Sequence, residues 1–240
     1  MLVLSVDTST PHVTAGVCRL EPAGPGDGPR IETLATRVTD DARAHAELLT
    51  PHILECLSTV GITPTELDAV VVGVGPGPFT GLRVGMATAA AFADAIGAPV
   101  HGVCSLDAVA ARARAAGVDG DVVVVTDARR REAYHARYNG EGVRTSGPIV
   151  GPAAEIDVTG ARVVGEPAKI AEIPAVGDGT GAAGAGALTS PDPAGLVAVA
   201  AADLLAGTDP APLVPLYLRR PDAVPPKPVE PSAALTGVQR

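Results

Sequence analysis

Aromatic side chains are scarce in this chain, which has 2 Phe, 3 Tyr and no Trp among 240 residues. Few rings are therefore available to fill a core or to stack on bases. Because 46% of the residues are hydrophobic, the core must be built from Val, Leu, Ile and Ala, which favours a layered α/β packing. The length suits one large domain or two small lobes.

Basic residues are in deficit as well. The chain has 18 Lys and Arg against 27 Asp and Glu, which gives a formal net charge of −9. Phosphate binding depends on Lys and Arg, so we do not expect this chain to grip a nucleic-acid backbone by itself. Contact with RNA is expected only indirectly, through a partner.

Paired cysteines and long apolar runs are missing too, and no secretory leader is expected. Cys18, Cys56 and Cys104 are odd in number and widely spaced, which indicates three reduced, buried thiols. The N-terminus MLVLSVDTST has no basic region, and Asp7 interrupts its apolar run. No apolar run reaches the length that a membrane span needs. These absences predict a soluble, cytoplasmic protein.

The chain does contain an alternation of strand and helix patterns. Apolar runs of strand length occur at 2–6, 13–20, 31–38, 70–74, 99–103, 121–126 and 131–138. Helices are expected from an N-cap at Asp40 or Asp41 to Val60, from near Thr80, from a cap at Ser105 through Ala116, and from Ala194 to Leu205. This alternation predicts a parallel sheet flanked by helices.

An internal repeat predicts two lobes. Residues 2–18 align without a gap with residues 122–138, which places Asp7 over Asp127 at the two hairpin turns. The expected division is an N-terminal lobe at 1–104, with 208–220 packing back on it, and a C-terminal lobe at 105–207 closed by the helix from Ala194. Residues 177–186 are expected to form a flexible loop, and residues 221–240 a Pro-rich, disordered tail.

Residues 73–85, GVGPGPFTGLRVG, form a glycine and proline loop that opens into a helix. No Lys follows the last glycine, and Pro76 and Pro78 remove two backbone donors, so this is not a Walker loop. In the helix, Gly81, Gly85 and Ala89 fall four residues apart and share one face. Close packing within the domain is the favoured explanation, and a partner chain or a ligand is the alternative.

Several motifs in order carry a family resemblance. They are VDTST at 6–10, AHAELLTPHI at 44–53, GVGPGPFTGLRVGMATAAAFA at 73–93, PVHGVCSLDAVA at 99–110 and PLYLRRPDA at 215–223. Together they resemble the TsaB (YeaZ) family. The duplicated strand–turn–strand likewise resembles the actin-like ATPase fold (ASKHA, ribonuclease H-like), in which two related α/β lobes clasp a nucleotide.

The resemblance implies a role in forming threonylcarbamoyladenosine, the modified base beside the anticodon in tRNAs that read codons starting with A. In that family the transfer is performed by the paralogue TsaD, which holds a metal through an H-x-x-x-H motif and is aided by the ATPase TsaE. The resemblance therefore implies a non-catalytic subunit that binds TsaD and has no cofactor of its own. Two points stay open: whether ATP or ADP sits at a composite interface with the partners, and whether a homodimer uses the same surface as TsaD.

The paralogue's metal motif should fall where this chain reads VHGVCSLDA. His101 is followed four residues later by Ser105 rather than by a second His, so we expect no metal site here. His101 is interpreted as structural.

A vestigial nucleotide site is a second expectation, at Asp7, Gly75, Gly77 and Asp127. In ATP-using members of the fold, the turns of the two aspartates face phosphates through magnesium. Here Ala128, Arg129 and Arg130 follow Asp127 and would crowd a closed phosphate pocket, although an Arg pair can also meet an anion. The favoured interpretation is that both aspartates hydrogen-bond the amides of their own hairpins.

The partner surface is expected on the first two helices. The predicted interface residues are His45, Leu48, Leu49, His52, Ile53, Cys56, Gly81, Arg83, Gly85 and Ala89. Arg83 is interpreted either as an anchor for the partner or as a solvated helix residue. Two other classes of function stay open: a small ATPase or kinase of the same fold and, less favoured, a metallopeptidase, for which neither H-E-x-x-H nor G-x-S-x-G is present.

Overall fold

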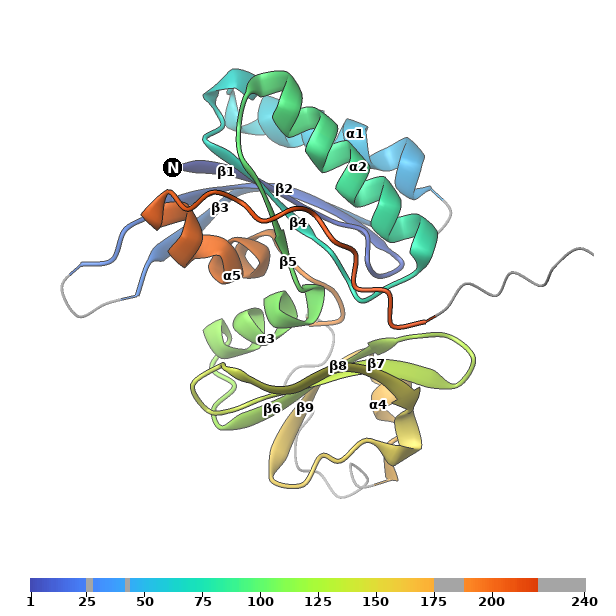
Figure 1. Ribbon diagram of the computed structural model, residues 1–240. Helices are drawn as coiled ribbons and strands as arrows, with labels where there is room; N and C mark the ends of the chain where they lie inside the picture. The colour runs from blue at the N-terminus through green and yellow to red at the C-terminus, as the bar shows by residue number, and fades with distance from the viewer. Residues whose placement is uncertain (25–27, 42–43, 175–187, 220–240) are drawn as a thin grey trace, which may run out of the picture.

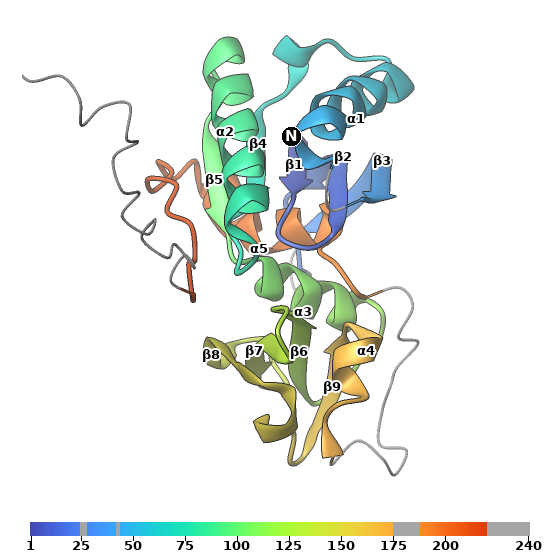
Figure 2. The same cartoon turned by 90° about the vertical axis from the view of Figure 1, so that its right-hand side faces the viewer.

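The computed structural model describes residues 1–24, 28–41, 44–174 and 188–219. They form two mixed sheets, one in each lobe, with helices between and outside them (Figures 1 and 2). The first sheet has the order β3-β2-β1-β4-β5. Its strands are β1 (Leu2–Asp7), β2 (His12–Glu21), β3 (Arg30–Asp40), β4 (Ala69–Gly73) and β5 (Val100–Val103). β2 is antiparallel to its two neighbours, β1 and β3, and β4 and β5 run parallel to β1.

The second sheet has the order β8-β7-β6-β9. Its strands are β6 (Asp121–Asp127), β7 (Glu132–Tyr138), β8 (Arg144–Pro152) and β9 (Ala161–Gly165). Again three antiparallel strands are followed by one parallel strand, β9 beside β6. The strand order β3-β2-β1-β4 therefore recurs as β8-β7-β6-β9, which confirms the two related lobes that the sequence repeat predicts.

Side chains alternate between the two faces of the buried strands, so both faces of the first sheet are apolar and both are covered by helices. On one face, Leu4, Val6 and Val72 pack against α1 (His45–Val60) and α2 (Phe79–Ile96). On the other face, Val3 and Val71 pack against α5 (Pro193–Ala206). A single-turn 3₁₀ helix (Pro64–Glu66), with a Thr63–Glu66 capping box, leads into β4.

The second lobe is covered in the same way. Val122, Val124 and Tyr138 pack against α3 (Ser105–Ala115), which lies between the two sheets. The opposite face, with Val123 and Val125, is covered by a 3₁₀ turn (Ala153–Glu155) and the short α4 (Pro167–Ile170).

The helix expected to close the second lobe belongs to the first, so the predicted boundary at residue 207 is wrong for α5. Leu196 and Val197 of α5 are fully buried in a cluster with Val3, Leu20 and residues of β4. The reason is the apolar second face of the first sheet, which needs a helix to cover it. α5 also packs against α3 and so joins the two lobes.

The segment after α5 crosses both lobes. The Leu216 amide donates to the Val74 carbonyl at 2.9 Å, and Leu213 and Leu216 pack against the first lobe's core. Leu218 packs against the core of the second lobe. Residues 213–218 therefore form an extended strap that contacts both lobes.

Two helix starts differ from expectation. β3 continues to Asp40, and α1 begins only at His45, with Ala44 as an N-cap that makes no side-chain bond. Ser105 is the first residue of α3 rather than its cap, because its hydroxyl donates to Asp7 instead. The predicted loop at 177–186 and tail at 221–240 lie outside the described residues.

Candidate functional site

The glycine and proline loop after β4 lies directly against the turn between β1 and β2. A side chain at Gly77 would overlap the backbone of Ser9, and one at Gly73 would overlap the carboxylate of Asp7. Gly75 has φ +97°, a conformation that glycine adopts without strain. The glycines of this loop therefore allow it to pack closely against the β1–β2 turn.

Asp7 joins the turn, the loop and α3. One carboxylate oxygen accepts from the Ser9 amide at 2.8 Å and the Ser9 hydroxyl at 2.7 Å, and the other accepts from the Ser105 hydroxyl at 2.6 Å. The Ser105 hydroxyl in turn accepts from the Gly75 amide at 3.1 Å. Burial raises the pKa of Asp7, while the hydrogen bonds from Ser105 and Ser9 lower it. Asp7 is thus hydrogen-bonded to its own hairpin, which is the interpretation that the sequence favoured. Asp127 is bonded in the same way, because it accepts from the Arg129 amide at 2.9 Å.

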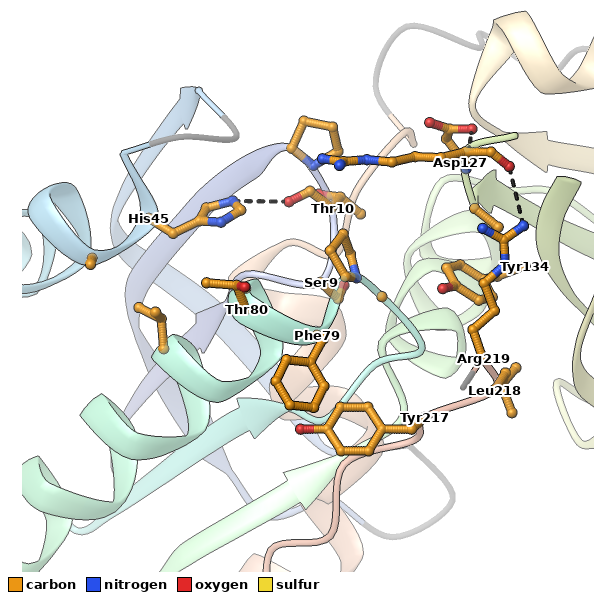
Figure 3. A pocket seen from close by; sticks show the side chains of 18 residues that line it. Ser9, Thr10, His45, Phe79, Thr80, Asp127, Tyr134, Tyr217, Leu218 and Arg219 are labelled. Atoms are coloured by element: carbon orange, nitrogen blue, oxygen red, sulfur yellow. Dashed lines mark hydrogen bonds between the residues drawn. The ribbon is translucent and has the colours of Figure 1, made fainter. Parts of the chain in front are cut away.

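A cleft of about 960 Å³ lies between the lobes (Figure 3). Its walls come from the β1–β2 turn, the starts of α1 and α2, the β6–β7 hairpin and the end of the strap. The residues that matter most for its chemistry are Ser9, Thr10, His45, Phe79, Thr80, Asp127, Arg129, Tyr134, Tyr217 and Arg219. The cleft therefore combines hydroxyl groups, rings and charges of both signs from distant parts of the chain.

An aromatic pair forms one edge of this cleft. The rings of Phe79 and Tyr217 stack with centroids 5.0 Å apart. The guanidinium of Arg83 lies 3.9 Å from the centroid of Phe79, and its Nε donates to the Tyr217 hydroxyl at 3.1 Å. Arg83 therefore holds the strap against α2, a role that neither of the two sequence interpretations included.

Three consecutive arginines form the tip of the β6–β7 hairpin on the second lobe. Arg129, Arg130 and Arg131 have φ of 60°, 53° and 65°, the left-handed region that residues with a side chain rarely adopt. The acidic residues at the base of this turn are held by other cations. Lys169 lies 3.6 Å from Asp127, and Arg219 forms an ion pair with Glu132.

Of the four residues predicted to form a nucleotide site, Gly77 and Asp127 line the cleft. Asp7 and Gly75 do not line it and are engaged in the hydrogen bonds described above. Sequence reasoning missed the cleft's rings. Phe79, Tyr134 and Tyr217 are three of the five aromatic residues, 2 Phe and 3 Tyr, in the whole chain. The scarcity of aromatic residues could have indicated the cleft, because the few that are present gather there.

The predicted partner surface is corrected by the structure. Eight of its ten residues are buried within the first lobe: His45, Leu49, His52, Ile53, Cys56, Gly81, Gly85 and Ala89. Side chains at Gly81 and Gly85 would overlap Thr8, so the small-residue stripe serves packing within the lobe. Leu48 is half-buried and Arg83 is exposed. The accessible side of these helices is therefore the side turned away from that stripe.

The described residues contain no group of three or more His, Cys, Asp or Glu side chains placed to hold a metal ion. His101 is buried on β5. The three cysteines are buried thiols, and burial raises the pKa of Cys18 and of Cys104 to about 11. In the part of the chain that the structure describes, no helix has the length and apolar character of a membrane span.

The fold and the cleft define a two-lobed α/β protein of the actin-like class. Residues 33–172 match the family model described as TsaD: tRNA N6-adenosine threonylcarbamoyltransferase. An uncharacterized protein of Mycobacterium tuberculosis is 51% identical over 227 residues, covering 93% of this chain and 94% of its own. The tRNA threonylcarbamoyladenosine biosynthesis protein TsaB of Bacillus subtilis is 31% identical over 139 residues, which is 58% of this chain and 55% of that protein.

Among solved structures, YeaZ from Pseudomonas aeruginosa superposes with a TM-score of 0.72 at 23% identity, covering 90% of this chain and 99% of that one. That likeness shows a shared fold. The chain belongs to the TsaD family, and it is similar to the proteins named TsaB and YeaZ.

Proposed function

We propose that this chain is a non-catalytic subunit in the cytoplasmic formation of threonylcarbamoyladenosine in tRNA, and that it binds and supports a TsaD-like transferase. The likeness to proteins named for this biosynthesis supports the process. The engagement of Asp7 supports a non-catalytic role, because both its oxygens already accept hydrogen bonds from the protein. ATP or ADP is therefore expected at an interface with TsaD or a TsaE-like ATPase rather than on this carboxylate.

The main support for a partner role is the composition of the accessible side of α2. This helix of 18 residues contains only two charged residues, Arg83 and Asp94. Its exposed and half-buried positions are otherwise small or apolar: Phe79, Thr80, Val84, Ala87, Thr88, Ala90, Ala91, Phe92, Ala95 and Ile96. An outer helix face so poor in charge is typical of a surface that a partner covers. On α1, Leu54 is 53% exposed and extends the apolar character.

Reconstitution with Ala91→Arg tests the proposal. The purified chain is combined with TsaD and TsaE of its own organism, threonylcarbamoyl-adenylate and unmodified tRNA. We expect Ala91→Arg to abolish co-elution with TsaD and to lower modification at least tenfold, because a charge at the centre of the buried surface loses its water. The same face is expected to serve a homodimer, so the variant should also be monomeric.

Ala202→Arg is the matched control. Ala202 is exposed on α5, which covers the opposite face of the same sheet, so the substitution adds the same charge to a helix outside the proposed surface. It should co-elute and support modification like the wild type. Modification that proceeds equally well without the chain, or with Ala91→Arg, would contradict the subunit role.

A further inference from the structure

We propose that the hairpin tip formed by residues 129–131 binds the phosphates of unpaired RNA, and that the ring of Tyr217 at the same cleft receives one of its bases. The choice of RNA rests on the proposed function in tRNA modification. The contact itself is inferred from the charges, the backbone and the rings of the cleft.

The hairpin tip carries a local positive charge, although the whole chain has a net negative charge. Asp127 and Glu132 flank the three arginines, but Lys169 and Arg219 already pair with them. Among the described residues, no carboxylate lies within ion-pairing distance of Arg129 or Arg131, and both are exposed. Since screening at 0.15 M salt limits exposed charges to about 8 Å, the local excess outweighs the net −9 for a ligand in contact with the tip.

The backbone of the tip supports a binding role. A left-handed conformation costs a residue with a side chain roughly 1–2 kcal/mol, which Gly or Asn would largely avoid. Here three arginines in a row adopt it. Retaining three guanidinium groups at positions that favour other residues indicates that the groups themselves are needed there.

Rings close to the tip favour RNA over an acidic protein segment. Arg219 reaches the Arg129 carbonyl at 3.4 Å, so Tyr217, two residues earlier, lies near the hairpin. Tyr217 is 38% exposed, and Figure 3 shows its ring beside that of Phe79 at the cleft. An exposed ring next to arginines provides the stacking surface and the phosphate contacts by which proteins bind single-stranded nucleic acid. An acidic peptide would need only the arginines.

The test is fluorescence anisotropy of a labelled, unstructured RNA of about seven nucleotides, within the usual range of single-strand site sizes, with the full chain at 50 to 200 mM salt. We expect a Kd of roughly 10–100 µM at 100 mM salt. Replacing the three arginines together, Arg129→Asn, Arg130→Asn and Arg131→Asn, should weaken binding at least tenfold and reduce the slope of log K against log salt by about 2. The thermal midpoint of this variant should not fall, because Asn tolerates positive φ.

Two matched variants separate charge from structure. Lys at the same three positions keeps the charges and should retain most of the affinity. Arg30→Gln, Arg114→Gln and Arg162→Gln remove three exposed charges away from the cleft and should leave binding within about twofold of the wild type.

Tyr217 is tested separately. Tyr217→Leu should weaken binding by about tenfold without changing the salt slope, because stacking involves no counterions. Tyr217→Phe keeps the ring and should bind like the wild type.

Unchanged RNA binding in the triple Asn variant would overturn the proposal, as would no binding by the wild type up to about 1 mM protein. A poly-glutamate peptide that displaces the RNA at equal charge concentration would assign the tip to an acidic partner instead. Co-elution with TsaD is measured on the same samples. If the wild type fails to co-elute, the proposed function fails, and the RNA result is judged on its own.

Discussion

The carboxylate of Asp7 is enclosed by its partners at the end of β1. Three donors, from Ser9 and Ser105, hold it in place, and it is 1% exposed. Its position at the end of β1 was predictable from the repeat, since Asp127 ends the equivalent strand. Its burial was not, because the residue that completes its surroundings, Ser105, is 98 positions away in the sequence.

Replacing Asp7 should change how stability depends on pH. Burial raises its pKa above the ordinary 3.8, so the folded chain keeps this proton to a higher pH than the unfolded chain does. The stability due to the protonated form is therefore fully present below about 3.8 and is lost as pH rises through the folded pKa. Asp7→Asn, which mimics the protonated group, should gain stability relative to the wild type as pH rises from about 4 to about 7.

Urea unfolding at several pH values measures this difference. Asp7→Ala is the comparison, since it removes every hydrogen bond at all pH values and should cost about 3 kcal/mol of unfolding free energy. A difference between wild type and Asp7→Asn that stays constant across the range would show that Asp7 keeps an ordinary pKa.

At the scale of elements, α2 shows what periodicity predicts and where it stops. Glycine and alanine at every fourth position predict a face of close approach, and the structure has one. Periodicity does not say what approaches, and here it is the β1–β2 turn of the same lobe. The partner surface was therefore placed on the wrong side of the helix, because the side chain that fills the stripe, Thr8, comes from a turn 73 residues before Gly81.

Gly85→Ala tests this packing. Alanine favours a helix over glycine by about 1 kcal/mol, yet the added methyl would overlap the Thr8 hydroxyl, which donates to the Gly81 carbonyl at 2.7 Å. We expect a net loss of about 1–3 kcal/mol in unfolding free energy. Gly85→Leu, which would fit a test of a partner surface, should fail to fold normally.

A double-mutant cycle assigns the cause of that loss. In a Thr8→Ala background the clashing hydroxyl is gone, so Gly85→Ala should cost less than about 1 kcal/mol. Equal costs in both backgrounds would mean that something other than Thr8 limits the space at Gly85.

At the scale of the whole molecule, the sequence predicted the duplication and the class of fold but misassigned α5. A gap-free repeat of β-branched strands is a strong local signal, and both hairpins formed as expected. The helix Pro193–Ala206 is apolar on most sides, so its pattern did not show which lobe it covers. Beyond Gly140, β8 and β9 were not predicted, because β8 is mostly exposed and β9 has only five residues, so neither leaves a clear pattern.

The strap connects the stabilities of the two lobes. Leu216 packs against both cores and carries the amide that bonds Val74, so it is the single side chain of the strap shared by the two lobes among the described residues. Leu216→Ala should lower unfolding free energy by about 1–2 kcal/mol, less than a fully buried leucine because the side chain is only partly enclosed. It should also uncouple the lobes, so that hydrogen exchange in the second lobe speeds up more than exchange in the first.

Val214 provides the control, because it is 65% exposed and lies two residues earlier in the strap. Val214→Ala should change the free energy of unfolding by less than about 0.5 kcal/mol. Equal effects of the two substitutions would mean that the strap lies on the lobes without stabilising their contact, whereas the expected contrast would show that packing of Leu216 against both cores couples the stabilities of the lobes.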